Sequence, residues 1–128
     1  MADTPPPPPP YNSYQAPTQM SPADEKLWAT LIHLGGIFFG FLPALIGYLV
    51  LRDRGPFIRE HTAAALNFQI SLVIYSAAIA ILGVVTFFIG FLLFIPLGIF
   101  ALVFMIIAAI AANEGRRYAY PLTIHFVS

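Results

Sequence analysis

The fold of this chain is decided by residues 62–113, which read TAAALNFQISLVIYSAAIAILGVVTFFIGFLLFIPLGIFALVFMIIAAIAAN. This run of 52 residues contains no Asp, Glu, Lys or Arg. As one straight helix it would extend about 78 Å, whereas the hydrocarbon core of a bilayer is about 30 Å thick. Two crossings of about 22 residues with a short connection fit that thickness. The run therefore predicts transmembrane helices over about 56–85 and 90–113, with the reversal around 86–90.

A second charge-free run covers residues 27–51, and its 25 residues are enough for one more crossing. Ser21 can cap this helix and Pro22 suits its first position, so we expect it over about 22–51, with a kink near Pro43. Backbone groups in lipid must hydrogen-bond internally, so each crossing is a helix. The sequence thus predicts an all-α polytopic membrane protein with three transmembrane helices. A re-entrant first segment, folded at Pro43, is the alternative.

The composition is typical of a chain that is embedded in a lipid bilayer. Hydrophobic residues make up 59% and charged residues 9%, whereas soluble domains carry roughly 25% charged residues. The net charge is zero and no basic stripe is present, so we expect the lipid bilayer as a partner and no nucleic acid. The absence of cysteine excludes disulfides and thiolate metal sites.

The membrane domain, residues 22–127, is flanked by two distinct ends. Residues 1–21 form a polar tail in which Pro5 to Pro10 is an uninterrupted proline run, typical of a disordered, polyproline II segment. This tail is either a ligand for a proline-binding module or, as we favour, a solvated spacer. Residues 114–128 are expected to be a short interfacial tail, in which apolar and polar residues alternate from Leu122 to Phe126.

One face of the first predicted helix is made of small residues. Gly36, Gly40, Ala44 and Gly47 follow His33 at helical spacing. Small residues let helix backbones approach closely, and this packing drives helix association in lipid. The stripe is either a homo-oligomer interface or, as we favour, a seam against the other helices of the same chain.

Function inside the membrane would depend on four polar residues, which are His33, Asn67, Ser71 and Tyr75. No ionised group accompanies them, so no carboxylate relay for protons can form. We expect His33 to be neutral and bonded to a neighbouring helix, with Ser76 as its best candidate partner. The residues on the second helix form either a polar pathway from the cytoplasm or, as we favour, interhelical hydrogen bonds.

Arginine placement predicts the orientation. Arg52, Arg54 and Arg59 lie in the first loop and are expected at the lipid headgroups, whereas the second loop has no Lys or Arg. The positive-inside rule then places the first loop and the C-terminus in the cytoplasm of a multi-pass cell-membrane protein. With three crossings the N-terminus lies outside; the re-entrant alternative puts it inside.

The sequence indicates no enzyme, no cofactor and no metal centre. We expect His33, His61 and His125 to lie far apart, and no carboxylate cluster joins them, so zinc is not expected. No serine has the context of a nucleophile elbow. Catalytic residues are therefore not assigned.

Three motifs resemble a known family. HLGG at 33–36, FIREHTAAALNFQ at 57–69 and YPLTIHF at 120–126 look like those of the bacterial domain-of-unknown-function family 4870. That family is distantly similar to the twenty-kilodalton, channel-like component of the chloroplast inner-envelope import translocon. The resemblance covers about residues 22–127 and implies a multi-spanning helical fold in a bacterial membrane, without catalytic residues. The plant relative has four crossings, against three expected here, so no import role is carried over.

Three functions remain open at this level. The first, which we rank highest, is a non-enzymatic structural or assembly component that packs with other membrane proteins or with copies of itself. The second is a small oligomeric transporter or channel, whose path His33, Asn67, Ser71 and Tyr75 would line. The third is an accessory subunit of a membrane enzyme that acts through the first loop.

Overall fold

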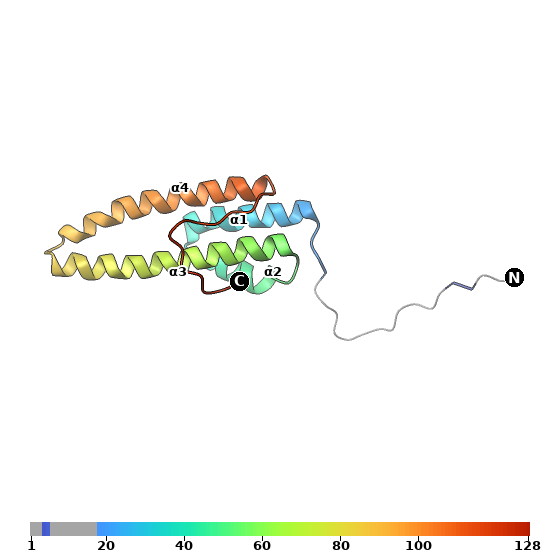
Figure 1. The fold of residues 1–128 in the computed structure, drawn as a ribbon, viewed down its shortest axis with the longest axis horizontal. Helices are drawn as coiled ribbons and strands as arrows, with labels where there is room; N and C mark the ends of the chain where they lie inside the picture. Colours follow the sequence, from blue (N-terminus) through green and yellow to red (C-terminus); the bar gives the residue numbers. More distant parts are fainter. Residues whose placement is uncertain (1–3, 6–17) are drawn as a thin grey trace.

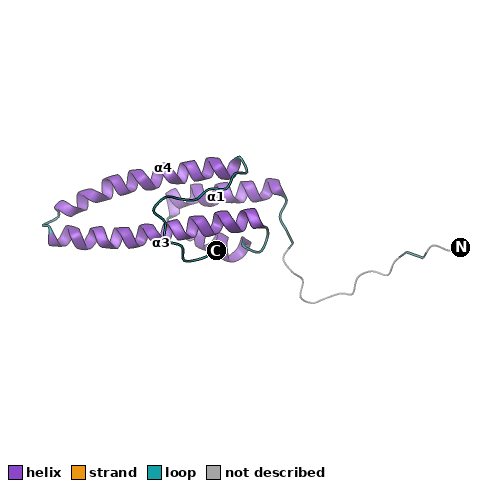
Figure 2. Cartoon of the chain, in the orientation of Figure 1, coloured by secondary structure: helices purple, strands orange, loops and turns teal. Residues whose placement is uncertain are grey.

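The computed structural model describes residues 4–5 and 18–128, and the predicted all-α fold is confirmed for them: they form helices and loops without a strand (Figure 2). The helices are α1 (Pro22–Phe39), α2 (Leu42–Leu51), α3 (Pro56–Val85), the short 3-10 helix η1 (Ile89–Leu93) and α4 (Phe94–Asn113). Most of the proline-rich run, residues 6–10, lies outside the described residues. The division of the chain at residue 21 therefore stays a prediction.

Residues 22–51 form two helices, where the sequence predicted one with a kink. Gly40 ends α1 with a φ of 65°, and Pro43 stands in the first turn of α2, where proline is tolerated. A Cβ added to Gly35 would lie 3.0 Å from the Pro43 ring, and one added to Gly47 would meet the side chain of Ile32. Residue 35 thus faces 43 and residue 32 faces 47, as in an antiparallel helical hairpin.

Two helical segments are long and apolar enough to cross a membrane, so three crossings are not confirmed. They are α3, with 30 residues, and the continuous segment Ile89–Asn113, with 25. Each half of the α1–α2 hairpin is shorter or more polar, and the two halves lie beside the first part of α3 (Figure 1). The physical reason for the difference is the reversal at Gly40, which returns the chain to the side from which it came.

The charged residues gather at one end of the bundle. The amide of Met20 donates to the carbonyl of Arg54 at 2.7 Å, which joins the start of α1 to the α2–α3 loop. A Cβ on Gly115 would lie 2.7 Å from the Lys26 side chain, so the end of α4 lies there as well. This region is called the charged end, and it comprises Asp24, Glu25, Lys26, Arg52, Asp53, Arg54, Arg59, Glu60, Glu114, Arg116 and Arg117.

The opposite end of the bundle is an apolar turn between α3 and η1 (Figure 1). Phe87 and Phe88 both have positive φ, at 53° and 74°. Thr86 organises the reversal, since its hydroxyl donates to the Leu82 carbonyl at 2.7 Å and accepts from the Gly90 amide at 2.8 Å. Phe87, Phe88 and Ile89 are 88%, 71% and 70% exposed, and these three residues are called the apolar tip.

Helix contacts in the core run through small residues. Ala29 of α1 and Ala108, Ala111 and Ala112 of α4 are completely buried, and α1 packs against α4, α3 and α2. Small side chains allow this close approach, which replaces the hydrophobic driving force that helices lack in lipid. Because α1 and α3 both start at the charged end, they run parallel. This relation decides which polar side chains meet.

We predict that Gly90→Ala destabilises the α3–η1 reversal. A Cβ at this position would lie 2.9 Å from the backbone nitrogen of Gly83 and from the backbone carbon of Leu82, and backbone cannot rotate away. We expect a loss of about 1–3 kcal/mol, typical of overpacking. Thermal unfolding in detergent, followed by circular dichroism, measures it.

Gly98→Ala is the matched control, because a Cβ there meets nothing within 4 Å and the residue lies inside α4. Replacing a helical glycine with alanine should stabilise by about 0.5–1 kcal/mol. Equal melting temperatures for the two variants would contradict the tight reversal.

Candidate functional site: a polar network between α1, α3 and the C-terminal tail

Three buried side chains from three parts of the chain form one hydrogen-bonded row. His33 of α1 lies between the hydroxyl of Tyr120, 2.6 Å from its Nδ1, and Nδ1 of His61, 2.9 Å from its Nε2. The Nε2 atom of His61 lies 2.8 Å from the carbonyl oxygen of Arg116. Both histidines are 1% exposed. The row joins α1 and α3 to two residues of the C-terminal tail, Arg116 and Tyr120.

The carbonyl at the end of the row fixes every proton in it when both imidazoles are neutral. A carbonyl only accepts, so His61 carries its proton on Nε2 and accepts on Nδ1. His33 must then donate from Nε2 and accept on Nδ1, which leaves the Tyr120 hydroxyl as its donor. Burial and the neighbouring Tyr118 phenol raise the pKa of Tyr120, so its hydroxyl keeps the proton that it donates. The arrangement is a satisfied buried network.

The C-terminal tail returns along α3 and is held there by side chains one helical turn apart. Asn67 accepts from the amides of Phe126 and Val127 at 2.8 and 2.9 Å and donates to the Val127 carbonyl at 2.8 Å. The hydroxyl of Ser71 accepts from the Ile124 amide at 2.9 Å. These contacts all reach the main chain of the tail, so they do not depend on its side chains.

Tyr75 completes the series, because its hydroxyl donates to the Leu122 carbonyl at 2.6 Å. Positions 67, 71 and 75 advance by four residues, which is about 6.0 Å along a helix. Their partners at 126, 124 and 122 step by two, about 6.6 Å along an extended chain. The two spacings nearly agree, so each turn of α3 presents one side chain to every second residue of the tail, which runs antiparallel to α3. We call residues 122–128 the strap.

The structure pairs His33 differently from the sequence expectation. Its partners are His61 and Tyr120, and Ser76 makes no hydrogen bond to it. Ser76 was chosen on the assumption that the first helix runs antiparallel to α3. Because the chain reverses at Gly40, α1 runs parallel to α3, and His33 lies level with the beginning of that helix.

The small-residue stripe is divided between two helices. A Cβ on Gly36 would lie 2.6 Å from the Gln69 amide of α3 and 3.2 Å from the Met105 sulfur of α4. Ala44 and Gly47 belong to α2 and are buried, whereas Gly40 has nothing within 4 Å of an added Cβ. The contacts described are made within the chain; a role in contacts between chains stays a prediction.

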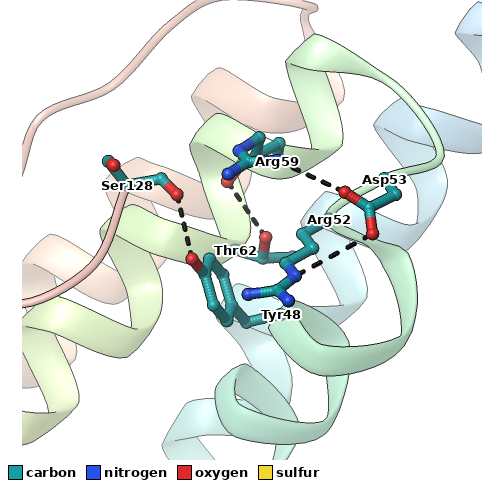
Figure 3. Close-up of polar contacts among 6 residues, drawn as sticks. All are labelled: Tyr48, Arg52, Asp53, Arg59, Thr62 and Ser128. Atoms are coloured by element: carbon teal, nitrogen blue, oxygen red, sulfur yellow. Dashed lines mark hydrogen bonds and ion pairs between the residues drawn. The ribbon is translucent and has the colours of Figure 1, made fainter.

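Arg52 and Arg54 lie between α2 and α3, and Arg59 lies in the first turn of α3. Figure 3 shows Arg52 and Arg59 on either side of Asp53. Arg59 contacts Asp53 at 3.3 Å and Arg52 contacts the same carboxylate at 3.9 Å, both with substantial exposure. The Arg54 guanidinium donates to the carbonyl of Thr18. Exposed pairs of this kind contribute little stability, so these residues are free to serve in contacts, and their headgroup role stays a prediction.

A groove of about 360 Å³ lies between the first part of α3 and the tail. Among its lining residues are Arg59, Glu60, Tyr118, Thr123 and His125. Across residues 4–5 and 18–128, no three His, Cys, Asp or Glu side chains are grouped so as to hold a metal ion. The groove also has an apolar lining, which includes Pro56, Ala63, Ala64 and Val127, so it is an open and mostly apolar surface with polar side chains at its edge.

Sequence reasoning missed Tyr120 and the strap, although a signal for the strap existed. The expectation that His33 and His61 lie far apart was wrong, since Nε2 of His33 lies 2.9 Å from Nδ1 of His61. The four-residue spacing of Asn67, Ser71 and Tyr75 was read as interhelical bonding, and the alternation from Leu122 to Phe126 as an interfacial segment. Matching the two periods would have paired the segments. Tyr120 carried no such signal, because only the parallel packing of α1 and α3 brings it to His33.

Comparison with known proteins gives one match. Residues 24–127 match the family model described as the magnetosome magnetite crystal formation protein family. The resemblance to the domain-of-unknown-function 4870 family and the chloroplast translocon component was therefore wrong, since it rested on three short motifs and this match spans the membrane domain. Curated proteins and solved structures yielded no match.

We predict that Tyr120→Phe destabilises the protein while Tyr118→Phe does not. The first change removes the donor to His33 and leaves a buried Nδ1 without a partner, at a cost of about 1–3 kcal/mol. The ring that stacks on Phe68 at 4.0 Å is retained. The Tyr118 hydroxyl makes no hydrogen bond within the described residues, so its loss should change little. Thermal unfolding in detergent compares them; equal loss in both variants would argue against the row.

Proposed function

The chain belongs to the magnetosome magnetite crystal formation protein family, and from that premise we propose that it is a non-enzymatic structural or assembly component of the magnetosome membrane. In this proposal it influences crystal formation by organising other membrane proteins, which dock at the charged end. It has neither a catalytic centre nor a transport path of its own.

The observation that carries the proposal is that the polar side chains among the apolar helices are already hydrogen-bonded within the chain. His33 is bonded on both ring nitrogens, and Asn67 uses both its oxygen and its nitrogen on the strap. A transporter needs polar groups that a substrate can reach. Here the same groups hold the chain's own tail, which supports a structural role.

The distribution of charge supports docking at one end. Arg117 contacts Glu60 at 3.2 Å and Arg116 contacts Glu114 at 2.7 Å, and these pairs are exposed. The apolar tip has no ionisable side chain and is suited to lipid. Electrostatic complementarity with a protein partner can therefore arise only at the charged end of the described part of the chain.

We further propose that the charged end faces the cytoplasm. The described arginines and Lys26 all lie there, and the positive-inside rule assigns such an end to the cytoplasm. Since α1 begins and α4 ends at this end, the chain would cross the bilayer twice, through α3 and through η1 with α4. The α1–α2 hairpin would be re-entrant, which is the alternative left open by the sequence.

Photo-crosslinking in magnetite-forming cells tests the assembly role. With a photoreactive residue in place of Arg54 or Arg117, we expect discrete adducts with other membrane proteins, because both positions lie at the charged end. The same residue in place of Phe88 is the matched control and should react with lipid. If the charged end gives no protein adduct, and proteoliposomes of the chain show an ion flux that Asn67→Leu removes, the transporter is the better description.

Cysteine labelling tests the orientation, and the chain contains no cysteine that would interfere. Asp24→Cys and Glu114→Cys should react with a membrane-impermeant maleimide from the same, cytoplasmic side. A cysteine in place of Ile89 should not react with the maleimide from the cytoplasmic side, and it should react less than a cysteine in a water-filled loop would. Reaction of positions 24 and 114 from opposite sides would restore three crossings.

A further inference from the structure

The strap has one outward face, and that face is apolar. Leu122, Ile124 and Phe126 are 72%, 43% and 50% exposed. They alternate with Thr123 and His125, which line the groove described above. Leu122 lies in a turn with a φ of 55°. From Thr123 onward the side chains alternate across the chain, so this part of the strap is amphipathic with a period of two residues.

One edge of the strap's main chain is bonded to the helices. Within the described residues, the amides of Thr123 and His125 and the carbonyls of residues 123–126 make no hydrogen bond. The amides of Ile124, Phe126 and Val127 and the carbonyls of Leu122 and Val127 are bonded by α3 side chains, and the Ser128 carbonyl accepts from Tyr48 at 2.9 Å. Extended backbone is excluded from hydrocarbon because its polar groups lose their partners. Here the side chains of one helix supply partners that a neighbouring strand would otherwise provide.

The strap extends along α3 to the level of the hydrocarbon core, where backbone groups need partners within the protein. Ser71 and Tyr75 are eleven and fifteen residues beyond Glu60, which is about 16 and 22 Å along α3. In the two-crossing arrangement proposed above, on which this inference rests, the headgroups lie near Glu60. The level of Leu122, opposite Tyr75, is then within the bilayer core, which is about 30 Å thick. The exposed residues of α3 around this level, Val73 and Ile74, are also apolar.

From these observations we propose that the strap is a lipid-facing strand: α3 holds its main chain, and Leu122, Ile124 and Phe126 contact the acyl chains of the bilayer. The outward face carries no polar group that a protein partner could bond, and it continues the apolar surface of a membrane-spanning helix. Acyl chains match both properties. The groove side, with Thr123 and His125, stays hydrated from the charged end.

Spin labelling of the full chain tests the proposal. Single cysteines at positions 122 to 126 are labelled, and the chain is reconstituted in vesicles of phosphatidylcholine and phosphatidylglycerol. The collision rates with oxygen, which concentrates in lipid, and with a water-soluble nickel chelate are then compared. Ile74→Cys serves as the lipid reference and Asp53→Cys as the water reference.

We expect the ratio of oxygen to nickel collisions to be several-fold higher at 122, 124 and 126 than at 123 and 125. A uniform ratio near that of position 53 would mean that the strap lies in water and would overturn the proposal. Protection from both reagents that weakens on dilution of protein in lipid would mean that a second copy covers the face, and would overturn it as well.

Two serine variants test whether α3 places the strand. Ser71→Ala removes the acceptor of the Ile124 amide and should lower the oxygen-to-nickel ratio at position 124. Ser76→Ala makes the same chemical change on the same helix without touching the strap, and it should leave the ratio unchanged. The same response in both variants would mean that the position of residue 124 does not depend on the Ser71 contact, and it would contradict the proposed support by α3.

Discussion

A peptide group in hydrocarbon must find its hydrogen-bond partner within the protein, and this constraint shapes the whole structure. Helices α3 and α4 meet it with their own backbone. Where the helices end, side chains take over: Thr86 bonds both sides of the reversal, and Asn67 bonds three groups of the strap. Thr86 and Asn67 thus supply hydrogen-bond partners to backbone that is not helical.

The helical class and the two long apolar segments could be predicted from residues 62–113, because length and absence of charge decide them. The α1–α2 hairpin could not. Proline is tolerated both at a kink and in the first turn of a helix, so Pro43 is compatible with either outcome. The deciding feature is the positive φ of Gly40, and this glycine was taken for a packing residue because of its spacing.

The polar network shows how one topological error spreads. The sequence singled out four polar residues within the predicted crossings, which are His33, Asn67, Ser71 and Tyr75. Their partners depend on direction: with α1 parallel to α3, His33 meets His61. The tail bonds His33 through Tyr120 and His61 through the Arg116 carbonyl. A wrong direction for one helix therefore changed the expected partner even though the residue itself had been identified.

The asymmetry between the two ends also bears on how the protein enters a membrane. An ionised side chain at the bilayer centre costs about 2.5–3.5 kcal/mol on insertion scales. The apolar tip with its flanking helical turns contains none, since Thr62 to Asn113 is free of charge. In the proposed two-crossing arrangement, the α3–α4 pair would pass into the bilayer tip first, as one preformed unit, while the charged end stays on the side of synthesis.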